Sequence, residues 1–126
     1  MSYDNVLSKG LGIVLIDSYS FGRIVIDGKT YTSDIILYPD RVDDGWWRKS
    51  GHLLQKEDLK DIIEYNPEIL IVGTGTYGLM NVLDETKQFL ELKEIELKAE
   101  ETGKACKIYN ELKEKRKVVA ALHLTC

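Results

Sequence analysis

Two uninterrupted apolar runs stand out in the second half of the chain. Residues 69–72 carry no charge, follow Pro67 and end at Gly73, and residues 118–122 form a second uncharged run. A strand that is buried on both faces has no polar side to present to solvent, so its sequence does not alternate. Both runs therefore predict interior strands of a sheet that is covered on both faces.

Amphipathic periodicity predicts three helices around these strands. Residues 55–65 place apolar side chains on one face and charged side chains on the other, and the pattern ends at Asn66-Pro67. Residues 84–94 repeat the pattern, although apolar residues before position 84 leave the start of this helix open. A third helix is predicted to begin with Thr102 as its N-cap and to carry apolar residues at helical spacing: Ala105, Ile108, Tyr109 and Leu112.

The first third of the chain is rich in β-branched and aromatic residues. Residues 11–17, 21–27 and 29–38 are predicted strands, separated by residues 18–20 and by the turn dipeptide Asp27-Gly28, which indicates an antiparallel meander. A short strand is predicted at residues 95–98. From position 69 onward strands and helices alternate, which favours right-handed crossovers and a mostly parallel core. The sequence predicts one α/β domain over residues 1–126.

Charge and composition narrow the classes of function. The formal net charge is −4 over 126 residues, and acidic and basic residues are mixed along the chain, so the basic face that nucleic acids require is not expected. Neither the first residues nor any apolar run has the pattern of a targeting or membrane-spanning segment, so we expect a soluble cytoplasmic protein. Two cysteines, Cys106 and Cys126, do not make a disulfide scaffold, and we expect reduced thiols.

The first candidate binding site is a G-x-G-x-x-G motif directly after a predicted strand: Gly73, Thr74, Gly75, Thr76, Tyr77 and Gly78. With Glu100 further along, this spacing matches a dinucleotide fingerprint, in which a helix N-terminus holds the pyrophosphate. However, only one half of the usual dinucleotide fold fits after Pro67, and a helix that starts at Asp84 begins too far from the glycines. A plain tight turn, a nucleotide site and a site for another small anion or carbonyl compound stay open, and no cofactor is assigned.

The second candidate site lies in the long irregular stretch of residues 39–51 and just beyond it: Trp46, Trp47, Arg48 and His52. Indole, guanidinium and imidazole groups in one loop can stack on a ligand or a partner surface and hydrogen-bond to it. Alternatively, one tryptophan fills the edge of the core while Arg48 pairs with Asp43 or Asp44. We expect one of the two tryptophans to be buried, because adjacent side chains tend to point apart.

The third candidate is His123 near the C-terminus. Residues three apart in a strand face opposite sides, so His123 is not expected to activate Cys126. A zinc site built from His52, Cys106, His123 and Cys126 lacks a closely spaced cysteine pair, and no metal is assigned. We expect His123 to be buried and bonded to backbone. Three acidic residues are expected only to form turns and to be solvated: Asp34, Asp43 and Asp44.

Several segments, in the same order along nearly the whole chain, together resemble one protein family: Phe21-Gly22-Arg23-Ile24, Trp47-Arg48, Gly51-His52, Pro67-Glu68, Gly73-x-Gly75, Ala105, Tyr109-Asn110 and Leu122-His123-x-Thr125-Cys126. It is a small uncharacterised family of archaeal and bacterial proteins that also contains an adipogenesis-associated protein of animals and a mitochondrial assembly factor of respiratory complex I. The chain resembles a stand-alone prokaryotic member. The resemblance implies a three-layer α/β domain with a central mixed sheet. It supplies no catalytic residues, which weighs against an enzyme.

Two functions therefore stay open. The first is a non-catalytic interaction or assembly module, whose partner protein or second copy docks on the loop of residues 46–52. The second is a small-molecule binding protein or enzyme, with nucleotides among the candidate ligands. Its pocket would lie between the turn of residues 73–78, the loop of residues 47–52 and His123. This second function requires the three segments to lie at the same end of the sheet.

Overall fold

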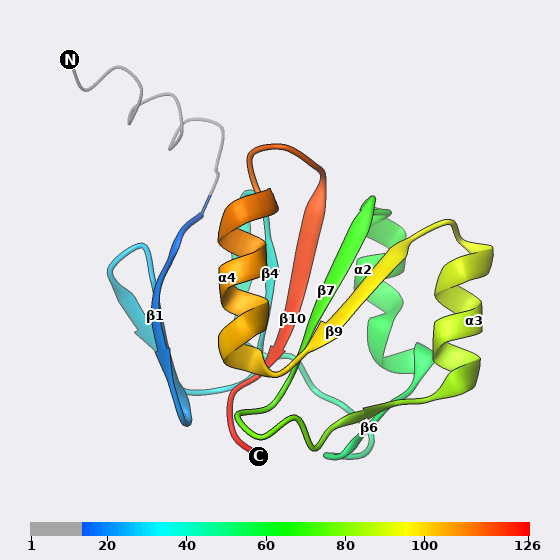
Figure 1. Cartoon of the computed structure of the whole chain (residues 1–126), viewed down its shortest axis with the longest axis horizontal. Coiled ribbons are helices and arrows are strands. Elements are labelled where there is room, and N and C mark those ends of the chain that lie inside the picture. Colours follow the sequence, from blue (N-terminus) through cyan, green and yellow to red (C-terminus); the bar gives the residue numbers. More distant parts are fainter. Residues whose placement is uncertain (1–13) are drawn as a thin grey trace.

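The computed structural model of the chain describes residues 14–126, and a five-stranded mixed sheet forms its centre, in the order β5-β4-β10-β7-β9 (Figure 1). Strands β7 (Ile69–Thr74), β9 (Glu96–Glu100) and β10 (Val118–His123) are parallel to one another. Strand β4 (Ile35–Tyr38) runs antiparallel to β10, and β5 (Arg41–Asp43) runs antiparallel to β4. The two uncharged runs form the interior strands β7 and β10, as predicted, and every residue of both strands is buried.

Helices cover both faces of this sheet, which gives three layers. One face is covered by α4 (Thr102–Leu112), and the other by three helical segments: η1 (Lys56–Leu59), α2 (Lys60–Tyr65) and α3 (Asp84–Leu92). Ile69 and Ile71 pack in the core on the α4 side, whereas Leu70 packs in the core on the other side. This alternation explains why the run shows no polar period, because both faces of β7 are buried.

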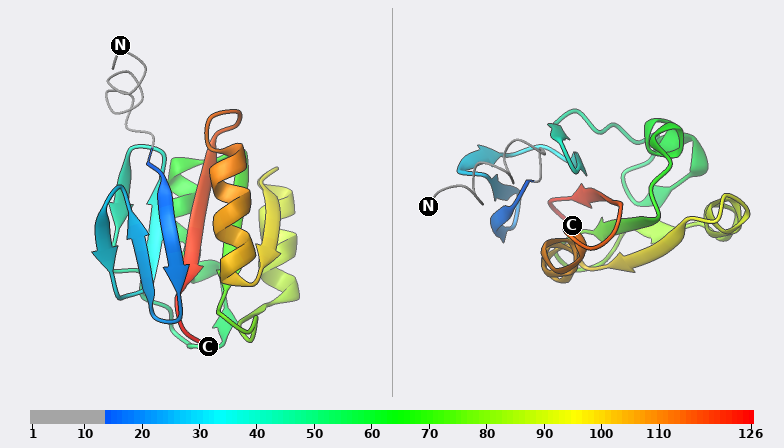
Figure 2. Two further views of the ribbon diagram at one scale, coloured as in Figure 1. Left: turned by 60° about the vertical axis from the view of Figure 1, so that its left-hand side comes forward. Right: turned by 90° about the horizontal axis from the view of Figure 1, so that it is seen from above.

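A separate three-stranded antiparallel sheet lies beside α4 (Figure 2). It consists of β1 (Ile16–Ser20), β2 (Arg23–Ile26) and β3 (Lys29–Tyr31). The side-chain amide of Asn110 in α4 ties this sheet to the helix, since it accepts from the N–H of Ile16 at 3.1 Å and donates to its carbonyl oxygen at 2.8 Å. A short parallel pair, β6 (Leu53–Leu54) with β8 (Asn81–Val82), completes the fold.

The N-terminal meander is smaller than predicted. Residues 35–38 leave it as β4 and pair with β10 in the central sheet, where all four side chains are buried. The first turn lies at Phe21-Gly22 rather than at residues 18–20, because Gly22 has a φ of +73° that glycine adopts readily. The Asp27-Gly28 turn is confirmed, with positive φ at both residues. The beginning of the predicted strand of residues 11–17 lies outside the described residues.

The helices also differ from prediction at their ends. The segment of residues 55–65 divides into η1 and α2, and residues 81–82 form β8, so the following helix does begin at Asp84. Thr102 is not an N-cap, because Glu101 occupies that position. The Thr102 hydroxyl instead donates to the carbonyl oxygen of His123 at 2.6 Å and accepts from the N–H of Gly75 at 2.9 Å.

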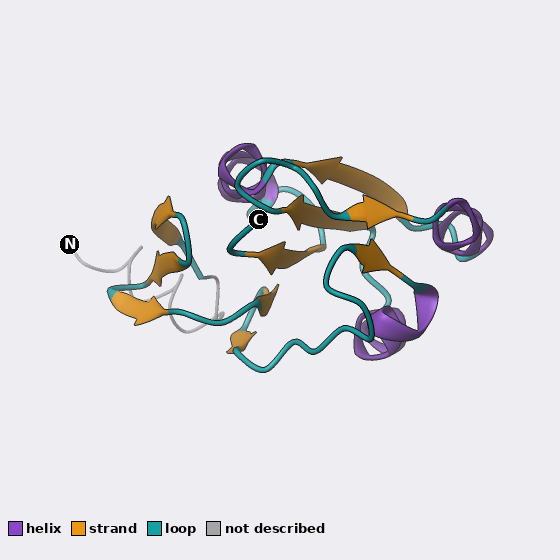
Figure 3. Cartoon of the chain, turned by 90° about the horizontal axis from the view of Figure 1, so that it is seen from below, coloured by secondary structure: helices purple, strands orange, loops and turns teal. Residues whose placement is uncertain are grey.

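The loops that follow the parallel strands gather at one edge of the sheet, which we call the carboxyl edge (Figure 3). β7, β9 and β10 end there. β4 runs in the opposite direction and begins there, so Asp34, which directly precedes β4, lies at the same edge. β5 also ends at this edge, and it leads into the irregular loop of residues 44–52. The topology therefore brings together segments that are far apart in the sequence.

Candidate functional site

Three charged or titratable side chains contact one another at the carboxyl edge, largely buried beneath the surface: Asp34, Arg48 and His123. Oδ2 of Asp34 lies 2.7 Å from Nδ1 of His123 and 2.9 Å from Nη1 of Arg48. The N–H of Leu124 donates to Oδ1 of the same carboxylate at 2.8 Å. The side chains are largely buried, with exposed fractions of 5% for Arg48, 9% for His123 and 19% for Asp34. We call these three residues the Asp34 network.

The protonation of the Asp34 network follows from its contacts. Burial alone raises the pKa of Asp34, but hydrogen bonds from His123, from the Leu124 N–H and from Arg48 outweigh burial, and the pKa lies below its usual value. The carboxylate is therefore an acceptor, and Nδ1 of His123 carries the proton that it donates. Nη2 of Arg48, 3.1 Å from that nitrogen, is then a neighbouring cation rather than a donor to it.

The position of the other ring nitrogen, Nε2, argues against His123 as a general base. Within residues 14–126 Nε2 has no hydrogen-bond partner, and it is buried. A general base must lie within hydrogen-bond reach of the proton that it removes. In this conformation no substrate proton reaches Nε2. We therefore assign the Asp34 network a structural role, in which it holds three segments of the chain together. Sequence reasoning expected backbone partners for the His123 ring, and this was wrong because β4 delivers a carboxylate to it.

The tryptophan loop is divided between the core and the surface. Trp46 is 8% exposed and Trp47 is 75% exposed, which confirms that one of the two is buried. The indole N–H of Trp46 donates to the carbonyl oxygen of Asp58 at 3.0 Å, and the guanidinium of Arg48 lies 4.6 Å from the centre of the Trp46 ring system. Arg48 pairs with Asp34 and not with Asp43 or Asp44, because the start of β4 lies beneath the loop. The side chain of His52 is exposed.

The glycine motif packs against other parts of the chain. Gly73 lies within β7, and a Cβ there would lie 2.8 Å from the Thr102 hydroxyl oxygen. At Gly75, with a φ of +105°, a Cβ would lie 2.8 Å from the carbonyl oxygen of Thr125. The N–H of Thr76 donates to that carbonyl oxygen at 2.7 Å, and the Thr74 hydroxyl donates to the carbonyl oxygen of Glu100 at 3.0 Å. The C-terminal residues therefore occupy the turn.

This packing does not support a dinucleotide site at the motif. Carbonyl oxygens approach Gly75, where a phosphate would need N–H donors. The next helix, α3, begins only at Asp84, so the glycines do not lead into a helix N-terminus. The three segments required for the small-molecule pocket do share the carboxyl edge, but they contact one another there. Gly78 has a φ of +70°, and the residues on either side of it, Tyr77 and Leu79, are exposed at the surface.

The cysteines take no part in this site. Cys106 is buried in α4, and burial raises the pKa of its thiol to about 12, so it is inert at neutral pH. Cys126 is exposed at the chain end. Neither cysteine forms a disulfide in the structure. In the part of the chain that the structure describes, no three histidine, cysteine, aspartate or glutamate side chains are arranged to hold a metal ion.

Large apolar side chains are exposed around the carboxyl edge, with exposed fractions between 54% and 75%: Phe21, Trp47, Tyr77 and Leu79. We call these four residues the aromatic edge. The Phe21 and Tyr77 rings lie against each other, with centroids 6.3 Å apart. Sequence reasoning included Trp47 and Tyr77 but missed Phe21 and Leu79. It expected Asp34 only to form a turn and to be solvated, which is wrong, because this carboxylate is 19% exposed and pairs with Arg48 and His123. The Phe21-Gly22 turn was visible in the sequence, but its place beside residue 77 was not.

The turns beneath the aromatic edge are held by hydrogen bonds to the C-terminal segment. The N–H of Gly22 donates to the carbonyl oxygen of Leu124 at 2.7 Å, and the Tyr19 hydroxyl donates to the same oxygen at 2.8 Å. Tyr19 also contacts the hydroxyl of Thr76. Burial raises the pKa of Tyr19 despite the hydrogen bond from Thr76, so its phenol stays protonated at neutral pH. The exposed rings of Phe21 and Tyr77 therefore stand on braced turns.

Comparison with known proteins finds one family whose model matches most of this chain. A family model described as "Protein of unknown function (DUF498/DUF598)" matches residues 16–123. The chain is 32% identical over 117 residues to the "13 kDa major membrane protein" of Francisella tularensis subsp. holarctica (strain LVS), a match that covers 86% of this chain and 89% of that protein.

Solved structures share the fold. The conserved hypothetical protein PH1505 from Pyrococcus horikoshii OT3 is 32% identical, with a TM-score of 0.76 over 88% of this chain and 98% of its own. An outer membrane protein from Bartonella henselae is 27% identical, with a TM-score of 0.78 over 92% of this chain and 98% of its own. A Mth938-like domain from Bordetella pertussis, 20% identical with a TM-score of 0.63 over 87% of this chain and 85% of its own, shares the fold alone.

The names of two relatives correct one expectation from the sequence. We expected a cytoplasmic protein, whereas the Francisella and Bartonella relatives are named membrane proteins. The expectation rested on the absence of a targeting or spanning segment, and such an absence does not locate a protein. Among the helices of residues 14–126, none has the length and apolar character to span a bilayer.

Proposed function

This chain belongs to the DUF498/DUF598 family of unknown function, and we propose that it is a non-catalytic interaction module. Its partner docks on the aromatic edge and is a membrane-associated protein. The observation that carries this proposal is the pair of exposed rings, Phe21 and Tyr77, 54% and 68% exposed and in contact with each other above turns that are hydrogen-bonded to the C-terminal segment.

Exposed and pre-ordered aromatic side chains are what a protein interface requires. Aromatic residues are enriched among the few residues that supply most of the binding energy at interfaces. Side chains that are already ordered lose less conformational entropy on binding, which favours affinity. The hydrogen bonds from Gly22 and Tyr19 to Leu124, together with the Asp34 network, supply this order beneath the surface.

Two further points support this function over catalysis. His123 Nε2, the ring nitrogen that would act as a base, is buried without a partner among the described residues. The resemblance to a family that includes a complex I assembly factor and an adipogenesis-associated protein favours docking onto other proteins. The names of the Francisella and Bartonella relatives support a partner in or at a membrane.

The experiment compares two surface variants in affinity capture from detergent-solubilised membranes of the source organism. The double variant Phe21→Ala/Tyr77→Ala removes the paired rings. The control, Leu92→Ala, removes an apolar side chain that is 83% exposed on α3, away from the carboxyl edge. We expect the double variant to lose the captured partner at least about tenfold, as for hot-spot residues, and Leu92→Ala to retain it. Thermal melting of both variants should match the wild type, because the truncated side chains are exposed.

Three outcomes would contradict the proposal of a membrane-associated protein as the partner. If both variants lose the partner equally, capture reflects general hydrophobicity rather than the aromatic edge. If the wild type floats with protein-free lipid vesicles and the double variant does not, the surface binds lipid and not a protein. A concentration-dependent dimer that the double variant abolishes would identify the partner as a second copy of the chain. The test leaves Trp46 and Arg48 unchanged, since both support the loop from within.

A further inference from the structure

The strand β9 leaves one edge of the central sheet open. It is the last strand in the sheet order, and among residues 14–126 no strand pairs with its outer side (Figure 1, Figure 3). The N–H of Glu96 donates to the carbonyl oxygen of Glu68 at 3.0 Å, on the β7 side. Backbone groups along a strand point alternately to its two sides, so those of Leu97 and Ala99 point outward. The outer edge of β9 therefore offers two N–H groups and two carbonyl oxygens to a further strand.

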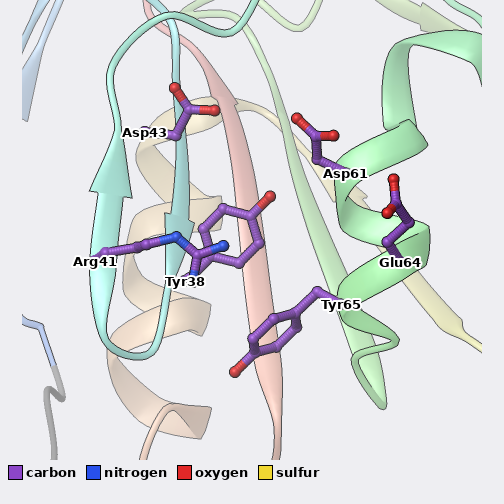
Figure 4. Close-up of a pocket in the computed structure, with 6 residues that line it drawn as sticks. All are labelled: Tyr38, Arg41, Asp43, Asp61, Glu64 and Tyr65. Carbon is purple, nitrogen blue, oxygen red and sulfur yellow. The ribbon is translucent and has the colours of Figure 1, made fainter.

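The other edges of the two larger sheets are shorter or are covered. Strands β3 and β5 have three residues each. At β5, the Arg41 side chain turns back over the Tyr38 ring, with its guanidinium carbon 3.9 Å from the ring centroid (Figure 4). At β1, the Asn110 side chain already binds both backbone groups of Ile16. Short strands and covered backbone groups are two of the ways in which sheet edges avoid further pairing.

Strand β9 has neither form of protection. Its five residues pair with Ile69–Gly73 of β7 in one unbroken register, without a bulge, and they include no proline or glycine. Ala99 is exposed and Leu97 is half-buried. An open and regular edge pairs readily with another chain, so proteins that do not use such an edge usually protect it. The missing protection is the first sign that β9 receives a strand.

A hollow beside β9 has room for side chains of an added strand. Its volume is about 340 Å³, and it is lined by α3 and by the beginning of β9: Lys87, Glu91, Ile95, Glu96 and Leu97. Ile95 is buried, and Leu97 packs against the same core cluster, so the β9 side chains on this face are apolar. A strand that pairs with β9 would place every second side chain on this face, beside α3. The hollow therefore favours apolar residues at those positions.

The other face of β9 carries alternating charges. Glu96, Lys98 and Glu100 share this face, because side chains alternate along a strand, and all three are partly exposed. A lysine often discourages pairing at an edge, but Lys98 already forms an ion pair with Glu96, at 3.0 Å. Opposite charges on facing residues of neighbouring strands stabilise the pairing, and like charges oppose it. The complementary strand is therefore basic, apolar, acidic, apolar and basic in turn, an order that is the same in both directions.

We propose that β9 receives an extended peptide segment of a partner protein as a sixth strand of the central sheet. The segment has the alternating basic, apolar, acidic, apolar and basic pattern. Its backbone bonds to Leu97 and Ala99, its apolar side chains lie in the hollow beside α3, and its charged side chains face those of β9. The site goes beyond the proposed function, since it shares no residue with the aromatic edge.

The test is an NMR titration of the full chain with the synthetic peptide acetyl-Thr-Lys-Val-Glu-Val-Lys-Thr-amide. We expect the largest amide shifts at Leu97 and Ala99, whose N–H groups should exchange rapidly with solvent in the free protein and slowly in the complex. Ala99→Pro removes an outward N–H and no bond to β7, so it should weaken binding at least about tenfold. Ala99→Ser keeps the N–H and should bind as the wild type does. Both variants should melt near the wild type, because residue 99 is exposed.

Changes in the peptide test the same bonds without changing the protein. One peptide is N-methylated at both valines, and another at the three charged residues. Only one of these two sets of N–H groups points at β9, whichever direction the peptide runs. We expect one methylated peptide to lose binding at least about tenfold and the other to keep it. A peptide of the same composition without the alternation, acetyl-Thr-Lys-Glu-Lys-Val-Val-Thr-amide, should also bind more weakly.

Other outcomes would overturn the proposal. Equal binding of both methylated peptides, or of the alternating and reordered peptides, would show general attraction to an acidic protein. The absence of any amide shift up to millimolar peptide would show that the edge takes no such segment. Protection of Leu97 and Ala99 in a concentration-dependent dimer would identify a second copy as the occupant. Phe21→Ala/Tyr77→Ala should bind the peptide as the wild type does, so failure of one proposal does not decide the other.

Discussion

At the scale of single residues, Asp34 connects the most distant parts of the chain. Its carboxylate holds Arg48 from the tryptophan loop, His123 at the end of β10 and the backbone of Leu124. Each of these groups is largely buried, so water could not take the place of the carboxylate as their hydrogen-bond partner. Removing one member of a buried ion pair leaves the other charge without a partner, which destabilises proteins strongly.

We expect Asp34→Asn to lower the free energy of unfolding by about 3 kcal/mol, the lower end of the range for breaking a buried ion pair, because Asp34 keeps some exposure. Urea unfolding measures the change. Asp44→Asn is the matched control, since Asp44 is exposed, and it should stay within about 0.5 kcal/mol of the wild type. Equal losses in the two variants would refute the structural role of the Asp34 network.

The same residue predicts a pH dependence. Because folding lowers the pKa of Asp34, its contribution to stability is complete above the pKa of an aspartate in the unfolded chain, about 3.9. The contribution is lost as the pH falls through the lower pKa of the folded state. The difference in unfolding free energy between the wild type and Asp34→Asn should therefore shrink in acid below about pH 4. Urea titrations from neutral to acid pH test this, and a difference that grows in acid would contradict it.

At the scale of elements, the end of β7 and the start of α4 are fitted to each other. The Thr102 hydroxyl bonds to both Gly75 and His123, which joins the ends of β7 and β10 to the first turn of the helix. Gly73 allows this approach, because a Cβ there would lie 2.9 Å from Leu122 Cδ2 and still closer to the Thr102 hydroxyl oxygen. Gly73 and Gly75 of the motif thus serve close packing, in positions that suggested ligand binding.

Two glycine substitutions separate packing from backbone freedom. Gly73→Ala should lower the free energy of unfolding by about 1–3 kcal/mol, the usual effect of overpacking a core. Gly103→Ala should be neutral or raise it by roughly 0.5 kcal/mol, because alanine favours helix and a Cβ there meets nothing within 4 Å. Chemical denaturation of both variants measures the contrast. Equal effects would mean that the approach of β7 to α4 is not tight.

At the scale of the whole molecule, the strands β1, β2 and β3 form a sheet of their own, which packs on the α4 side of the core and pairs with no strand of the central sheet. The Asn110 amide bonds to both backbone groups of Ile16, and Gly22 and Tyr19 bond to Leu124. Ile24 and Ile26 add apolar contacts in the core on the α4 side. The central strands β7 and β10 are buried on both faces, so they should open only with global unfolding.

This attachment predicts separate opening of the small sheet. Asn110→Ala should lower the protection of amides in β1, β2 and β3 against hydrogen exchange by about tenfold or more, because it leaves two backbone groups of Ile16 without partners. Amides of β7 and β10 should lose less protection than those of the small sheet. Hydrogen exchange followed by NMR gives both values in one sample. Uniform loss across all strands would show one cooperative unit instead.

The sequence by itself determined the layers of this protein. Uncharged runs predicted the interior strands β7 and β10, and helical periodicity predicted the helices that cover them, because local pattern records which faces are buried. It also predicted that one of the two adjacent tryptophans would be buried. Element ends were less certain, as at Thr102, because a hydroxyl that caps a helix in one setting bonds to a distant carbonyl in another.

Only the tertiary structure decided which side chains meet. β4 leaves the meander and pairs with β10, and this pairing carries Asp34 to Arg48 and His123. The same topology sets Phe21 against Tyr77 and places β9 at an edge of the central sheet. No local pattern encodes such meetings, because they depend on strand order and direction. The sequence therefore specified what is buried, and the order of the strands decided which groups form the sites.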